Sequence, residues 1–235
     1  MIVNLSLIIL FAIALHFENK TLNVFGIQPT AKRLVQLLFG FLLTATLSII
    51  INLVFAQVAN FVWELNENRS MQRFMGDLYR TFNSVLFEEL IFRTYALYKL
   101  LQYLGERNSI IITSAIFGVY HWFTFGVLGN YPMMIWIFFY TGLWGAMFAF
   151  SYTRTGTIFL AIGLHWGWNF VDQIIFEKNG AGLLRPVTND KTVFLNDMKG
   201  FVITVLPTIM FAIIIISYLA KVKTLQINKK SSGFH

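Results

Sequence analysis

Three ionisable side chains, Glu88, Glu89 and Arg93, lie in a window of six residues inside an otherwise largely apolar stretch. A charge at the centre of a membrane helix costs roughly 2.5–3.5 kcal/mol on insertion scales, so such residues usually have a function. Arg93 follows Glu89 by four residues, the spacing of an ion pair on one helix face. Glu88 has no basic residue three or four positions away. We therefore predict that Glu89 and Arg93 form a structural pair and that Glu88 is available for chemistry.

Two further apolar segments each carry a histidine with a companion residue at helical spacing. Phe117 precedes His121 by four residues, so the two side chains share a helix face. His165 and Asn169 share a face in the same way, and Asp172 lies on the next turn. At about 1.5 Å rise per residue, alternating helices place the three polar clusters within about two helical turns in depth. We expect them to meet in one polar cavity below a single membrane face.

These residue types suit the hydrolysis of a peptide bond. A carboxylate can take a proton from water, and a neighbouring imidazole can orient that water and keep the carboxylate ionised. A second imidazole and a carboxamide on one helix face can donate hydrogen bonds to a developing oxyanion. The chain has no Cys and no Ser in a sharp glycine turn, so no protein nucleophile is predicted. Asp172 fits either a partner of His165 or a residue at the membrane interface.

The composition is that of a membrane protein. Of the 235 residues, 57% are hydrophobic and only 12% are charged, and the mean hydropathy is +0.64. A soluble domain usually carries about 25% charged residues. Residues 34–63 and 108–153 contain no Asp, Glu, Lys or Arg. The net charge of +7 is scattered between apolar runs, which indicates loops beside a membrane rather than a nucleic-acid surface.

The apolar runs predict an all-α fold, a polytopic transmembrane helical bundle of about seven membrane helices with a polar intramembrane cavity. The expected helices lie near residues 2–17, 34–62, 80–104, 109–125, 131–152, 157–177 and 200–220. We expect one integral membrane domain over 1–235, with its motif core at 80–177 and a basic C-terminal tail at 221–235. The first helix has no basic segment before it, so we expect it to be retained rather than cleaved as a signal peptide.

The connections between these helices differ in length. Tight polar turns are expected at 105–108 and 153–156, and longer connectors at 18–33, 63–79 and 178–199. The last connector is long enough to act as a lid. The distribution of Lys and Arg favours, by a modest margin, an N-terminus outside and a C-terminus inside the membrane.

Three motifs occur in a fixed order over roughly residues 85–170: Glu88-Glu89-x-x-Phe92-Arg93, Phe117-x-x-x-His121 and His165-x-x-x-Asn169. Together they resemble the CPBP family, which comprises the type II CAAX prenyl endopeptidases and their bacterial relatives, the Abi proteins. The resemblance implies a helical membrane core and an intramembrane endopeptidase. It assigns water activation to Glu88 and His121. It assigns the stabilisation of the oxyanion to His165 and Asn169.

The resemblance also implies the setting of the reaction. The expected partners are the lipid bilayer and a peptide or protein substrate. The scattered charge argues against nucleic acid, and we expect no cofactor, although the family has also been described as metalloproteases. The expected location is a bacterial cell membrane, which the chain crosses several times. Thr94 stands where many family members have Gly after the arginine, and this difference is expected to alter the close packing of helices there.

Two alternatives stay open. Glu88, His121 and His165 are a carboxylate and two imidazoles, which can form a catalytic zinc site with an open position. No His-Glu-x-x-His helix is present and Asn169 suits an oxyanion better, so a metal-free mechanism is preferred. The other alternative is a non-catalytic membrane scaffold or immunity protein, or a proton-coupled transporter with Glu88, Glu89 and His121 as its relay. The chain lacks the internal repeat that is typical of many transporters.

Overall fold

The computed structural model describes residues 1–177, 181–187 and 198–222, and these residues are mostly helical. The α-helices are α1 (Ile2–His16), α2 (Ala31–Val58), α3 (Met71–Arg93), α4 (Tyr95–Thr124), α5 (Tyr131–Thr155), α6 (Phe159–Phe170) and α7 (Met198–Lys221). A 3-10 turn at Leu22–Phe25 follows α1, and a π-helical turn at Val171–Ile175 follows α6. The predicted all-α class is confirmed.

Three helices are long and apolar enough to cross a membrane. They are α2, α5 and the Val202–Lys221 part of α7. Helix α1 is apolar but has 15 residues, which at about 1.5 Å each do not reach across a hydrocarbon core of about 30 Å. The part of the chain that the structure describes therefore has seven α-helices, but seven membrane spans are not confirmed.

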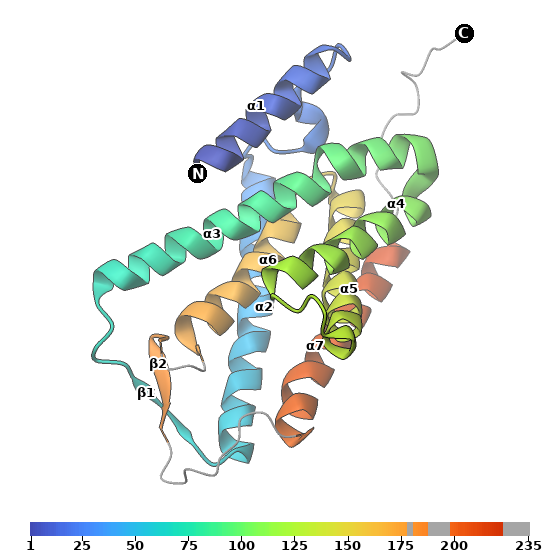
Figure 1. The fold of residues 1–235 in the computed structure, drawn as a ribbon. Helices are drawn as coiled ribbons and strands as arrows, with labels where there is room; N and C mark the ends of the chain where they lie inside the picture. The colour runs from blue at the N-terminus through green and yellow to red at the C-terminus, as the bar shows by residue number, and fades with distance from the viewer. Residues whose placement is uncertain (178–180, 188–197, 223–235) are drawn as a thin grey trace.

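The helices surround the middle of α6. Helices α2 and α5 pack against α6, α7 packs against α5 and α2, and α3 crosses this group obliquely (Figure 1). Helix α3 runs almost in line into the first part of α4, after which the chain turns back and α4 packs along α5 (Figure 1). The three segments with the predicted polar clusters, in α3, α4 and α6, thus come together although they are far apart in the sequence.

The predicted helix at 80–104 is wrong at both ends. Helix α3 already begins at Met71, because the Ser70 side chain accepts a hydrogen bond from the Arg73 amide and caps the helix. It ends at Arg93, and Thr94 interrupts the helical backbone with φ −100° and ψ −108°. The buried Thr94 hydroxyl donates to the carbonyl of Leu90 and so satisfies one of the last carbonyls of α3.

The two predicted tight turns are present. The first is confined to Gly105, whose φ of +73° breaks the helical path inside α4. The second follows Thr155, where Gly156 in the left-handed conformation (φ +65°) ends α5.

Two segments predicted as irregular connectors form a small antiparallel sheet. Strand β1 (Val62–Leu65) pairs with β2 (Leu184–Val187), with Val62 opposite Val187 and Leu65 opposite Leu184. Most of the predicted lid at 178–199 lies outside the described residues, as does the basic tail from residue 223 onward.

A close crossing of α2 and α6 fixes the orientation of the histidine on α6. A Cβ added to Gly163 would collide with the carbonyl of Leu37, and one added to Gly167 would collide with the carbonyl of Phe41. Small residues four apart let two helix backbones approach in this way. His165 is two residues from each glycine, about 200° around the helix, so its side chain points away from α2.

Candidate active site

A cavity of about 620 Å³ lies where α3 to α7 and α2 converge. Its walls include all five polar residues singled out in the sequence that do not belong to the Glu89–Arg93 pair: Glu88, His121, His165, Asn169 and Asp172. The convergence expected from helix depth is therefore present.

Glu88 presents one carboxylate oxygen to two imidazoles. Its side chain is 9% exposed, and Oε1 accepts a hydrogen bond of 3.4 Å from the Ser84 hydroxyl. The buried Oε2 has no hydrogen-bond partner among the described residues. It lies 3.9 Å from Nε2 of His121 and 3.8 Å from Nε2 of His165. These separations are too long for direct hydrogen bonds and are the right length for a bridging water.

His121 is held by the residue that precedes it by one helical turn. Its Nδ1 lies 2.8 Å from the carbonyl oxygen of Phe117, which can only accept a hydrogen bond. Nδ1 therefore carries the proton, and in the neutral ring Nε2 directs a lone pair at Glu88. The Phe117 ring packs at 4.4 Å from the imidazole centroid and limits its rotation. The geometry gives His121 a basic nitrogen on the cavity side.

Glu89 and Arg93 form the buried pair that their spacing predicts. Arg93 Nε lies 3.3 Å from Glu89 Oε2, and the two side chains are 1% and 0% exposed. The guanidinium also donates to the carbonyl of Gly145 at 3.1 Å and lies over the rings of Phe117 and Phe148, at 4.4 and 5.2 Å from their centroids. These contacts, together with burial, hold the Arg93 guanidinium in one position.

The pair has a third member that sequence reasoning missed. Glu89 Oε1 lies 2.9 Å from Nδ1 of His165, on α6. The ring of Phe148 stacks on the same imidazole at 4.8 Å and 18°. Glu89 therefore orients His165 as well as pairing with Arg93. Residues 76 positions apart share no helical spacing, so no local signal could have shown this contact.

Asn169 and Asp172 line the cavity beyond His165. Asn169 is one turn further along α6, and Asp172 lies in the π-helical turn that replaces the expected regular helix to residue 177. Such turns widen a helix locally and occur often at functional sites. The sequence predicts that Asp172 is either a partner of His165 or a residue at the membrane interface. Its position in the cavity wall is compatible with both predictions.

Much of the remaining wall is aromatic. Tyr140 forms a hydrogen bond of 3.2 Å with Thr208 across α5 and α7, and Trp136, Trp144 and Trp168 lie beside it in the wall. In a chain with 25 Phe and 6 Trp, aromatic content alone gives no signal that separates a cavity wall from packing.

The carboxylate and the two imidazoles are spaced more widely than the ligands of a zinc ion. Tetrahedral zinc with bonds of about 2.0–2.1 Å places its ligand atoms roughly 3.4 Å apart. Glu88 Oε2 lies 3.8 and 3.9 Å from the two histidine nitrogens, and no group of three or more metal-binding side chains was found among the described residues. The side chains as placed do not fit zinc, so we derive no step through a metal. The absence of a cofactor stays a prediction.

Apolar helices of membrane-spanning length, α2, α5 and α7, thus lie around a buried carboxylate–imidazole site. Residues 74–171 match a family model described as type II CAAX prenyl endopeptidase Rce1-like. The matched segment includes Glu88, His121, His165 and Asn169, so the predicted resemblance to this family is confirmed. A search of the curated proteins and a search of the solved structures each found no significant match.

Proposed function

We propose that the protein is an endopeptidase that hydrolyses a peptide bond of a membrane-associated peptide or protein, and that Glu88 and His121 activate the water. The family assignment supports proteolysis in general. The observation that carries the residue roles is the approach of two imidazole nitrogens to within 3.9 Å of one buried glutamate oxygen. The family name refers to prenyl substrates, and we extend to this chain only a membrane-associated peptide.

The first step needs two acceptors around one water. Glu88 Oε2 and the Nε2 lone pair of His121 are both acceptors at 3.9 Å, so a water between them can donate one hydrogen bond to each. This water attacks the carbonyl carbon, its proton passes to Glu88, and the carbonyl oxygen becomes an oxyanion. When the intermediate collapses, Glu88 returns the proton to the leaving amine, so it acts first as base and then as acid.

The oxyanion is stabilised by Asn169 and His165 in different ways. The Asn169 amide is a neutral donor. His165 already donates Nδ1–H to Glu89, so its Nε2 can donate only when the ring carries a second proton. That imidazolium would have the carboxylates of Glu88 and Glu89 on two sides and would balance their charge together with Arg93. Glu89 and Arg93 are thus positioning residues for His165.

A cleavage assay tests the proposal. Purified full-length protein in liposomes is incubated with a pool of N-acylated peptides, and new peptide ends are identified by mass spectrometry. Wild type and Glu64→Gln should produce the same ends, since Glu64 is half exposed on β1 and does not line the cavity. Glu88→Gln should produce none. Equal cleavage by Glu88→Gln would contradict the assignment of Glu88 as the base, whereas the non-catalytic scaffold or transporter predicts that wild type produces no new ends.

Metal analysis of the same active preparation tests the mechanism. The metal-free mechanism predicts that activity survives removal of zinc by a chelator. Stoichiometric zinc that is lost together with activity would overturn it and assign Glu88, His121 and His165 as ligands.

A further inference from the structure

Part of the cavity wall takes no part in the proposed mechanism and consists of hydrogen-bond acceptors. It includes Asn52 on α2, Tyr140 on α5 and Asp172 in the π-helical turn. With Glu88, Asp172 brings a second carboxylate to the cavity, and the described residues that line the cavity include no Lys or Arg. The Asp172 carboxylate is thus a negative charge in the wall that none of the catalytic steps above requires.

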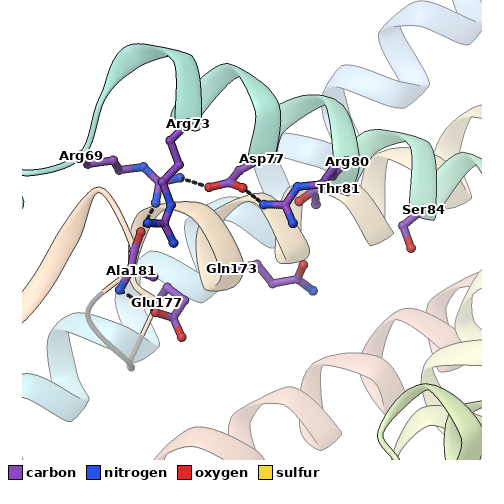
Figure 2. A pocket seen from close by; sticks show the side chains of 9 residues that line it. All are labelled: Arg69, Arg73, Asp77, Arg80, Thr81, Ser84, Gln173, Glu177 and Ala181. Carbon is purple, nitrogen blue, oxygen red and sulfur yellow. Dashed lines mark hydrogen bonds and ion pairs between the residues drawn. The ribbon is translucent and has the colours of Figure 1, made fainter.

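Arginines lie nearby, but they line a separate pocket on the N-terminal half of α3 (Figure 2). There Arg69 and Arg80 both pair with Asp77. The two pockets share Ser84 and Gln173, and neither Arg69 nor Arg80 lines the catalytic cavity. A substrate that fills the cavity therefore meets carboxylates in its wall and no guanidinium.

The internal hydrogen bonds of this wall use its donors and leave acceptors. Nδ2 of Asn52 donates to the carbonyl of Ser48 at 2.9 Å and to its hydroxyl at 3.4 Å. The Thr208 hydroxyl donates to the carbonyl of Val205 at 2.7 Å, so Tyr140 is the donor in its hydrogen bond of 3.2 Å with Thr208. A further partner therefore meets Oδ1 of Asn52 and the lone pairs of the Tyr140 oxygen, which are acceptors.

Aromatic rings line the cavity beside these acceptors. Trp136 stacks on Tyr140 with ring centroids 5.6 Å apart, and the rings of Trp144 and Trp168 lie 5.1 Å apart. The faces of such rings attract cations, most strongly where water is excluded. Trp144 also has a buried N–H without a partner among the described residues, which suits a backbone carbonyl of the same ligand. Together these groups favour a ligand with a cationic end and several N–H donors.

The acceptor wall lies within reach of the reacting groups. Asp172 follows His165 by seven residues, about 10 Å along a helix at about 1.5 Å per residue. His165 Nε2 in turn lies 3.8 Å from Oε2 of Glu88, the oxygen beside the attacking water. An extended peptide covers about 10 Å with three residues. A side chain that reaches Asp172 therefore belongs to a residue within three positions of the scissile bond.

We propose that the wall formed by Asn52, Tyr140 and Asp172 binds the side chain of a substrate Lys or Arg within three positions of the scissile bond. An ammonium donates up to three hydrogen bonds and a guanidinium five, and neither accepts any, so both match a wall of acceptors. The Asp172 carboxylate offsets the cost of taking the cation out of water. The inference rests on the proposed peptidase function.

Paired peptides test this wall separately from the chemistry. In one peptide whose cleavage depends on Glu88, the three positions on each side of the scissile bond are filled in turn. Each position receives Lys or its uncharged analogue norleucine, and Arg or its uncharged analogue citrulline. Wild type in liposomes should show, for at least one position, a KM about tenfold lower for the charged form, with little change in kcat. Equal KM values at every position, or lower values for the uncharged forms, would overturn the proposal.

Asp172→Asn should remove this preference, because it keeps the shape of the side chain and takes away its charge. The KM of the charged peptide should rise to that of the uncharged one. Tyr140→Phe loses one acceptor and keeps the ring, so it should reduce the KM ratio by a few-fold. Glu64→Gln, an equal loss of charge on β1 outside the cavity wall, should keep the full ratio.

Asp172 as a partner of His165 would give a different result. Asp172→Asn would then lower kcat equally for both peptides and keep their KM ratio, which would overturn the proposal. If circular dichroism shows that Asp172→Asn does not fold, Tyr140→Phe decides, and an unchanged KM ratio in this variant would contradict the acceptor wall. Full activity of Glu88→Gln would instead contradict the proposed base and leave the KM ratio as it is.

Discussion

Helix α3 carries a carboxylate–guanidinium pair near each end, and the two pairs differ in how far water reaches them. At the C-terminal end Glu89 and Arg93 are 0% and 1% exposed. At the N-terminal end Asp77 pairs with Arg80, whose side chain is 76% exposed. A buried charge that loses its partner stays desolvated, whereas an exposed one is solvated again. The buried pair should therefore set the structure of the active site, and the exposed one should contribute little to it.

The largest effect on stability is expected from Arg93→Ala. This variant leaves Glu89 buried and without its cation, which should cost about 3–5 kcal/mol of unfolding free energy. Arg80→Ala removes the exposed pair and should cost about 0–1 kcal/mol. Unfolding in detergent, followed by circular dichroism, measures both. Equal losses of unfolding free energy in the two variants would show that burial does not make the Glu89–Arg93 pair more important for stability than the Asp77–Arg80 pair.

A smaller loss is expected from Gly163→Ala at the crossing of α2 and α6. The added Cβ meets the carbonyl of Leu37, so the helices must separate, at a cost of about 1–3 kcal/mol. Because α6 carries His165, cleavage should fall as well. Gly76→Ala on α3 is the matched control, since nothing lies within 4 Å of its added Cβ. Unchanged stability and activity of Gly163→Ala would argue that the close crossing does not position His165.

The smallest effect is expected at a third charged cluster, where α1 meets α4. Burial alone would raise the pKa of Glu18, but contacts with Lys99 at 2.5 Å, Tyr95 at 3.1 Å and Lys20 at 3.3 Å lower it below its ordinary value of 4.5. A lowered folded-state pKa stabilises the protein above pH 4.5, and this contribution disappears as the pH falls through the folded-state pKa.

Glu18→Gln should therefore lower the melting temperature at neutral pH, and the gap from wild type should close as the pH falls below about 4.5. Melting curves in detergent across this range measure the gap. A gap of the same size at pH 3 and pH 7 would show that the Glu18 charge does not stabilise this cluster.

The parts of the site that sequence predicts are those set by one helix. The spacing of Glu89 and Arg93 predicts their pair, and that of Phe117 and His121 predicts their contact. Helix lengths then predict that the clusters lie at similar depth, because alternate helices start from alternate faces of the membrane. These predictions need only the helical periodicity and the length of each apolar segment, and both are given directly by the sequence.

The parts that sequence reasoning missed depend on contacts between distant segments. The Thr94 break follows no Gly or Pro, so the apolar pattern continues through it. The contact of Glu89 with His165 joins α3 to α6, and no spacing rule connects them. Gly163 and Gly167 did offer a signal, since small residues four apart in an apolar segment often mark a helix crossing. That motif does not indicate which helix packs against α6, so the crossing with α2 could not be predicted.

In the proposed mechanism the ionised carboxylate of Glu88 is the base that activates the attacking water. The most direct test is the initial rate of cleavage of one identified peptide by Glu88→Gln, at protein levels matched to Glu64→Gln in the same liposomes. Loss of a general base should lower kcat by roughly 10²–10⁴-fold while KM changes little. The same kcat for both variants would contradict the assignment of Glu88 as the catalytic base.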